Sequence, residues 1–308
     1  MLLIAIVAGV TIYLVYRALP GIHQAGPTLC AVCTKIQPLL LFIMLFLSFS
    51  KIAPSDLRFR RWMLPLLLIQ GLSFVILSAI ILFVFPGNIP LEALMLCMIC
   101  PTATACSVIT YRLGGDIAGV VTYTILINLL VSILFPLMIP LIHPSPEITF
   151  WSTSAQILYK VFKVLLLPCI LAWAVRYLLP KAQTWLVDHS HWSFYIWSVG
   201  LMLAIVMTTR SICHSTAGFG TLVAIAAASL FSCIIQFWAG KKIGKSPAEK
   251  ITAGQSLGQK NTVFAIWLAY TFMDPVVSVA GGFYCIWHNV YNSYQLKLSR
   301  DSALLKNN

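Results

Sequence analysis

A succession of long apolar runs constrains the fold of this chain more than any other feature. The hydrocarbon core of a bilayer requires about 20 apolar residues of helix. We count ten such runs, with approximate limits 2–19, 36–50, 62–85, 91–113, 117–142, 153–179, 192–209, 218–238, 251–272 and 275–296. The sequence therefore predicts an all-α polytopic membrane protein with ten transmembrane helices.

Composition excludes a soluble protein. Only 9% of the 308 residues are charged, whereas 60% are hydrophobic. A soluble domain carries about 25% charged residues, so this chain has too few to cover a water-facing surface. The formal net charge of +12 does not indicate nucleic acid, because the basic residues lie in short loops between the runs. We expect a monomer in a lipid bilayer, the bacterial inner (plasma) membrane, with no nucleic-acid partner.

The basic residues also predict the orientation. With ten spans, one set of loops collects most Lys and Arg, including Arg58, Arg60, Arg61, Lys241 and Lys242. The other set holds Arg17, Lys35 and Arg210, with Lys160 and Lys163 near it. Cytoplasmic loops carry the excess of Lys and Arg. Both termini are therefore predicted to be cytoplasmic.

Two of the runs are interrupted by polar residues. The fourth contains Cys100-Pro101-Thr102-Ala103-Thr104-Ala105-Cys106-Ser107, and the ninth contains Thr252-Ala-Gly-Gln-Ser-Leu-Gly-Gln-Lys-Asn-Thr262. Each is the fourth span of a five-span half, and halves with an odd number of spans insert with opposite orientation. Broken helices at matching positions of inverted repeats indicate the binding site of a transporter near the midplane. The alternative is a proline kink and a set of packing glycines without a site.

Lys260 lies inside the ninth run. An ionisable residue at membrane depth costs roughly 2.5–3.5 kcal/mol on insertion scales and usually marks a substrate or ion pathway. The alternative is a side chain that reaches along its stem to an aqueous cavity without a coupling role. We expect Lys260 to take part in substrate binding or ion coupling.

Three short motifs resemble those of the bile acid:sodium symporter family. Trp287-His288-Asn289 is similar to the family's last-helix signature. The stretch from Cys100-Pro101 to Thr110-Tyr111 is similar to its fourth-helix motif, and Gly258 with Asn261 matches the glycine and asparagine of its ninth-helix motif.

This resemblance implies one transmembrane domain over 1–308 with two inverted five-helix repeats, about 1–145 and 150–297. Helices 1, 2, 6 and 7 would form a panel, and helices 3–5 and 8–10 a core in which broken helices 4 and 9 cross at the midplane. Family members carry bile acids and small carboxylates by alternating access, with two sodium ions bound behind the substrate.

The resemblance also implies a set of site residues. The first sodium site would use Cys106, Ser107, Asn128, Ser132 and Ser256, and the second Gln70 and Lys260. Thr104, Gln259 and Asn261 would line the crossing. His288 could relay protons, although His288 and Asn289 are better explained as structural.

The ninth-helix motif departs from the family pattern at two positions. The family's glutamate is Ser256 and its glutamine is Lys260, and both changes reduce affinity for a cation. A glutamate with two sodium ions and a serine with one ammonium both carry one net positive charge. We therefore hypothesise that the Lys260 ammonium replaces a bound sodium ion. Lysine can also carry a proton, because burial disfavours its charged form.

The predicted function is secondary active transport of a small organic anion, with no firm metal site and no cofactor. The coupling ion stays open between none, a proton and sodium. The first alternative is a sodium-coupled symporter with degenerate sodium sites at Ser107, Asn128, Ser132, Ser256 and Gln70, and a remoter one is a channel. An enzyme is not expected, because the runs contain no His-Glu-x-x-His, no Gly-x-Ser-x-Gly and no buried pair of acids.

Overall fold

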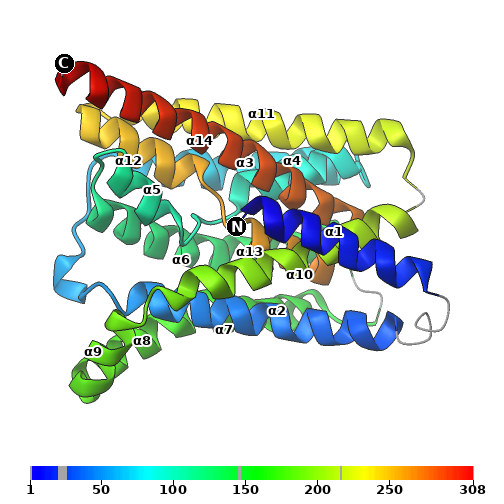
Figure 1. Cartoon of the computed structure of the whole chain (residues 1–308). Coiled ribbons are helices and arrows are strands. Elements are labelled where there is room, and N and C mark those ends of the chain that lie inside the picture. Colours follow the sequence, from blue (N-terminus) through cyan, green and yellow to red (C-terminus); the bar gives the residue numbers. More distant parts are fainter. Residues whose placement is uncertain (1, 20–25, 145–146, 216, 308) are drawn as a thin grey trace.

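The structure is a computed structural model that describes residues 2–19, 26–144, 147–215 and 217–307. This part is all-helical and contains no sheet, as predicted (Figure 1). Its α-helices are α1 (Leu2–Ala18), α2 (Gly26–Phe49), α3 (Met63–Phe83), α4 (Ile89–Ile99), α5 (Cys106–Arg112), α6 (Ile117–Ile142), α7 (Phe150–Leu165), α8 (Leu167–Leu178), α9 (Pro180–Asp188), α10 (Trp192–His214), α11 (Phe219–Ile243), α12 (Pro247–Gly258), α13 (Thr262–Phe272) and α14 (Val279–Asn307). Two short 3₁₀ turns are added, η2 (Pro54–Asp56) and η3 (Pro275–Ser278).

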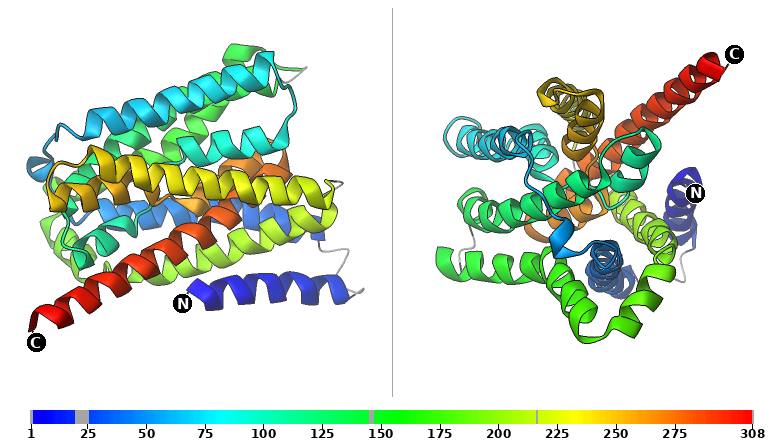
Figure 2. Two further views of the ribbon diagram at one scale, coloured as in Figure 1. Left: turned by 90° about the horizontal axis from the view of Figure 1, so that it is seen from above. Right: turned by 90° about the vertical axis from the view of Figure 1, so that its left-hand side faces the viewer.

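The long helices run side by side in one main direction (Figures 1 and 2). α1 packs on α10 and α10 on α2, while α11 packs on α4, α12 and α14. Seen end-on, α1 lies at the periphery of the bundle (Figure 2). Five helices are long and apolar enough to span a membrane (α2, α3, α6, α10 and α11), and the bent pair α7–α8 makes a sixth candidate within the described residues. α1, α4 and α13 are apolar but shorter.

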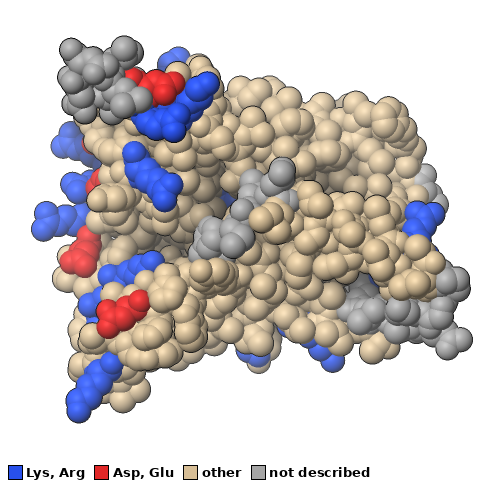
Figure 3. Space-filling model, in the orientation of Figure 1, with Lys and Arg blue, Asp and Glu red and all other residues tan. Residues whose placement is uncertain are grey.

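The outward helix faces are apolar, as a bilayer requires. On α3, Leu64, Leu68, Leu72 and Ile76 repeat every four residues and are each at least half exposed. Residues four apart share one face of a helix. Exposed apolar surface on this scale identifies a membrane protein, because soluble monomers avoid large apolar patches. Most Lys and Arg side chains gather at one end of the molecule, on the left in Figure 3.

The helices differ from the predicted runs at several places, and α14 continues to Asn307, eleven residues past the predicted end of the tenth run. α2 begins at Gly26, ten residues before the predicted run, because the helix continues through Thr34 and Lys35, which precede that run. The sixth run is two helices bent by 42° at Leu166. Pro168 lies in the first turn of α8, where the missing N–H and the ring prevent continuation of α7. α9 is an additional helix that was not predicted.

Glycines bring α11 and α12 into backbone contact. A Cβ on Gly240 would lie 2.5 Å from the backbone oxygen of Ala253, and a Cβ on Gly258 would overlap the Phe237 ring. Any larger residue at either position would push α11 away from α12, because packed helices leave no such space. This close packing holds the end of α12 at a defined place in the core.

Candidate functional site

The two broken segments meet backbone to backbone. The Ala103 N–H donates to the Gln259 carbonyl at 2.8 Å, and the Asn261 N–H donates to the Pro101 carbonyl at 2.8 Å. Thr102 and Lys260 thus form an isolated antiparallel bridge. Backbone groups released by a break inside a membrane must find protein partners or line a cavity. Here the backbone groups of each break serve as hydrogen-bond partners for the other. Residues more than 150 positions apart therefore form one site, around Pro101–Ala103 and Gln259–Asn261, which we call the crossing.

The side chain of Gln70 on α3 binds the backbone of the first break. α4 ends at Ile99, and Cys100 leaves the helical conformation with φ −51° and ψ 131°, near the polyproline II region that a residue before proline prefers. The side-chain amide of Gln70 donates to the carbonyls of Ile99 (3.0 Å) and Cys100 (2.8 Å). Its oxygen accepts from the Tyr123 hydroxyl at 2.9 Å. Gln70 therefore lies at the first break, where its amide caps the end of α4 and is not a free ligand.

The second break is held by three side chains. Tyr284 on α14 donates its hydroxyl to the Gly258 carbonyl at 2.8 Å. Thr102 donates to the Ser256 carbonyl at 2.7 Å. Asn261 caps α13, because its side-chain oxygen accepts from the Phe264 N–H at 3.2 Å. The N-terminus of α13, with its partial positive charge, therefore points into the crossing.

Lys260 is buried at the centre of this arrangement. The residue is 1% exposed, and its Nζ has no hydrogen-bond partner among the described residues. The titratable groups in electrostatic range are the thiols of Cys97, Cys100, Cys106 and Cys233. A buried ammonium without a counter-ion is costly. The site therefore favours an anion beside Lys260 or loss of the lysine proton.

A buried carboxylate does exist, but it lies elsewhere. Among the described residues only Glu92 is a buried acid, 2% exposed. It lies in the first turn of α4 and contacts His143 Nε2 at 3.0 Å. Glu92 therefore belongs to the end of the span, where it is paired and not solvated.

The residues predicted for the first sodium site are buried polar groups on neighbouring elements. Asn128 and Ser132 are each 1% exposed and share one face of α6. Asn128 Nδ2, Ser132 Oγ and Ser256 Oγ have no hydrogen-bond partner among the described residues. α6 packs on both α5 and α12, which carry Cys106 and Ser256. Unpartnered buried polar atoms are rare in folded proteins and need an explanation such as a bound ligand.

These residues fit a metal cation poorly. Sodium prefers oxygen ligands and gains from a carboxylate, but none of the polar side chains named at the crossing is acidic. No group of three or more His, Cys, Asp or Glu in the described part could hold a metal ion. Unpartnered atoms at the crossing also include the donors Lys260 Nζ and Asn261 Nδ2, besides the acceptor Gln259 Oε1. Such donors suit an anion better than a cation.

The remaining predicted residues lie at the edge of the crossing. Thr104 and Ser107 are half-buried. His288 is 4% exposed and packs edge-on against Tyr284, with ring centroids 5.7 Å apart. Asn289 donates back to the Cys285 carbonyl of its own helix at 2.7 Å. His288 thus touches the crossing through Tyr284, whereas the Asn289 amide serves α14 itself.

Sequence reasoning missed three residues that build the site. Thr102 lies within the predicted break but was not proposed as a site residue, and Tyr123 and Tyr284 lie in apolar runs where a tyrosine attracts no notice. A hydroxyl inside an apolar run needs a buried partner. The backbone carbonyls that the two breaks leave without a helical partner can accept such hydrogen bonds.

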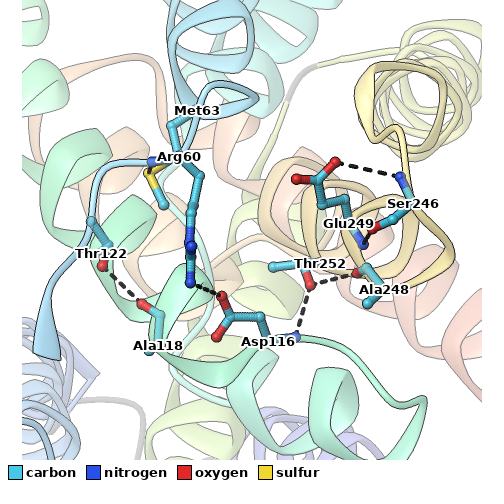
Figure 4. Close-up of polar contacts among 9 residues, drawn as sticks. All are labelled: Arg60, Met63, Asp116, Ala118, Thr122, Ser246, Ala248, Glu249 and Thr252. Atoms are coloured by element: carbon cyan, nitrogen blue, oxygen red, sulfur yellow. Dashed lines mark hydrogen bonds and ion pairs between the residues drawn. The ribbon is translucent and has the colours of Figure 1, made fainter.

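The crossing is also fixed at one end of the bundle (Figure 4). The Thr252 hydroxyl accepts from the Asp116 N–H at 2.9 Å and donates to the Ala248 carbonyl at 2.7 Å. Asp116 pairs with Arg60 at 3.3 Å. Gly114 has a φ of +86°, which only glycine adopts freely. The turn between α5 and α6 is therefore docked on the first half of α12.

Comparison with known families identifies the chain. Residues 38–215 match the Sodium Bile acid symporter family, which is more than half of the 308 residues. The chain belongs to this family. No curated protein matches it significantly. The matched segment contains the first break and α6 but ends before α12, so Lys260 lies outside it.

Membership confirms the resemblance detected in the motifs. It implies a transmembrane secondary transporter of the bile acid and organic anion class with a small anion as substrate, and not an enzyme. It does not determine the coupling ion.

Proposed function

We propose that this symporter-family protein carries an organic anion by alternating access without requiring sodium, because the Lys260 ammonium stands in place of a bound sodium ion. The observation that carries the proposal is the environment of Lys260. Its side chain is buried and unpartnered, and it projects from the bridge that joins the two breaks. A fixed cation at this position supplies the charge that a metal ion would otherwise supply.

The architecture that goes with this proposal has ten spans in two inverted repeats, 1–145 and 150–297, within one domain. α1, α2, α7–α8 and α10 would form the panel, and α3, α4–α5, α6, α11, α12–α13 and α14 the core. The contacts of α1 with α10, α10 with α2 and α2 with α8 support the panel, and those of α11 with α4, α12 and α14 support the core.

The concentration of Lys and Arg at one end (Figure 3) supports cytoplasmic termini. A monomer in the inner membrane is part of the same proposal.

An anionic substrate follows from the charges at the crossing. The Lys260 ammonium and the N-terminus of α13 both favour negative charge. Thr104, Cys106, Ser107, Gln259 and Asn261 would line the substrate or ion path. The neutral polar groups Asn128, Ser132 and Ser256 would orient Lys260 or the substrate and not a sodium ion.

Uptake into proteoliposomes tests the proposal. We would measure uptake of ¹⁴C-cholate and ¹⁴C-lactate, one large and one small carboxylate, with external sodium replaced by choline at constant pH. The expected result is saturable uptake of at least one probe that does not change in choline. Uptake strictly dependent on sodium would instead support the alternative of a sodium symporter with degenerate sites, and uptake that never saturates would indicate a channel.

Matched variants connect the result to the site. Lys260→Gln should reduce uptake at least tenfold, about the effect of losing one charge-assisted contact. Lys250→Gln removes the same charge from an exposed position in the first half of α12 and should leave uptake unchanged. Repeating the uptake at several pH values separates proton coupling from uncoupled transport. Unchanged uptake by Lys260→Gln would overturn the site assignment.

A further inference from the structure

A cavity with a mixed polar and apolar lining lies away from the two breaks. The helix ends that form it are at the end of the bundle opposite to most of the Lys and Arg side chains (Figures 1 and 3). It is formed by the end of α10, the start of α11, the start of α4 and the η3 turn, and its volume is about 410 Å³. Small-molecule sites typically occupy roughly 300–1,000 Å³. The cavity is therefore large enough for a small organic molecule.

One wall of the cavity suits a carboxylate. Arg210 and Ser211 from α10 line it, and Thr221 comes from the first turn of α11. Ser211 is 6% exposed and its Oγ has no hydrogen-bond partner among the described residues. α11 is 25 residues long, and its N-cap Gly218 supplies no side-chain cap. An uncapped helix N-terminus beside an arginine is a favourable place for an anion.

The lining of the cavity also contains an acid. Asp274 lines the cavity, and one of its oxygens accepts from the Val276 N–H at 2.9 Å. His214 also lines the cavity, and its Nδ1 is engaged with the Tyr13 hydroxyl at 3.1 Å. Ile89 and Val276 add apolar surface. The lining thus includes a cation, an acid and apolar side chains.

We propose that this cavity is a second substrate site, which binds a carboxylic acid that also carries a hydroxyl or amino group and an apolar body. The carboxylate contacts Arg210, Ser211 and the start of α11, and the hydroxyl or amino group donates to Asp274. That this ligand is the transported anion rests on the proposed function, whereas its binding to the cavity does not.

A second buried hydroxyl without a hydrogen-bond partner among the described residues lies near Ser211. Thr208 lies three residues before Ser211 on the same side of α10, is 6% exposed and also has an unpartnered hydroxyl. A Cβ built on Gly282 of α14 would lie 3.1 Å from Thr208. A Cβ on neighbouring Gly281 would lie 3.3 Å from the carbonyl of Thr262, the first residue of α13. α10, α13 and α14 are therefore closely packed between the cavity and the two breaks.

Saturation-transfer NMR on the full-length protein in detergent tests the proposal, with 3-phenyllactate as the probe. 3-Phenylpropionate, which lacks the hydroxyl, and 3-phenyllactamide, which lacks the charge, are the matched controls. We expect phenyllactate to bind, phenylpropionate to bind about tenfold more weakly, and the amide not to bind, because each comparison removes a hydrogen bond to a charged group. Binding of the amide as strong as that of phenyllactate would overturn the proposal, and so would no detectable binding of phenyllactate.

Variants locate the binding. Arg210→Gln and the milder Ser211→Ala should each weaken phenyllactate, and Asp274→Asn should remove the preference for phenyllactate over phenylpropionate. Lys260→Gln should leave phenyllactate binding intact even where it abolishes uptake, which separates this proposal from the proposed function. Phenyllactate binding that survives both Arg210→Gln and Ser211→Ala but is lost in Lys260→Gln would place the ligand at the crossing and reject the second site.

Discussion

The two breaks differ in how tightly they are packed. In the second break every residue from 252 to 269 is buried, including the charged Lys260. In the first, residues 103–105 are half-buried, and α5, only seven residues long, exposes Val108 and Tyr111. Segments with fewer buried contacts open at lower free-energy cost. The cation is therefore held in the rigid break, and the looser break is the side on which we expect movement around a substrate.

Close helix packing explains the rigidity of the second break. Gly258 ends α12 against the Phe237 ring, and Tyr284 covers its carbonyl. The first break has a proline and small residues but no comparable contact at Thr104 among the described hydrogen bonds. Rigid packing of this kind keeps a buried charge without a counter-ion. In a looser segment, water and mobile side chains would reach the charge and solvate it.

The largest effect is expected when the charge of Lys260 is removed from the second break, which we describe as the rigid one. Lys260→Met should abolish transport and yet raise stability by about 2–4 kcal/mol, because the unpartnered ammonium is costly in the folded state. Thermal unfolding of the purified protein in detergent measures this, with Lys250→Met as the exposed control. A lower melting temperature for Lys260→Met would mean that the ammonium has a stabilising partner, against the site described above.

Adding one methyl group tests the packing of the second break. Gly258→Ala should cost about 1–3 kcal/mol, because its Cβ would overlap the Phe237 ring and α11 would have to shift. Gly220→Ala is the matched control, since its Cβ would have no atom within 4 Å. Thermal unfolding of both variants makes the comparison. Equal melting temperatures would show that the second break is no tighter than the protein surface.

The hydroxyls of the first break should differ from each other. Thr102→Val removes the bond to the Ser256 carbonyl and should cost about 1–2 kcal/mol, because a buried carbonyl loses its donor. Thr104→Val, two residues away and half-buried, should cost less than about 0.5 kcal/mol. Chemical denaturation of the two variants gives the difference. If Thr104→Val cost as much as Thr102→Val, the first break would be packed as firmly as the second.

The smallest effect is expected where the crossing is fixed at the end of the bundle. Arg60→Ala breaks an ion pair that is 45% and 38% exposed, and exposed pairs contribute about 0–1 kcal/mol. Thr252→Val should cost more, because its hydroxyl bonds the Asp116 N–H and the Ala248 carbonyl. Salt dependence separates the two, since only the ion pair is screened. A larger loss in Arg60→Ala would show that charge and not the threonine docks this turn.

Local pattern was sufficient for much of the site. Pro101 and the polar residues around Gly258 identified both breaks, since each interrupts an apolar helix by its own chemistry. Lys260 was found for the same reason, as a charge in an apolar run. The bend at Leu166 and the role of Gln70 were not found, because neither Pro168 nor a lone glutamine reveals its partners in the sequence.

By itself the sequence determined the membrane class, the helical content, the family and the positions of the two breaks. These depend on hydropathy and on residues next to one another in the chain. Only the tertiary structure decided that Thr102 pairs with Lys260, that Gln70 caps α4 and that the ammonium lies among thiols. Such contacts join residues 27 to 163 positions apart, and their energies arise from packing that no single stretch of sequence contains.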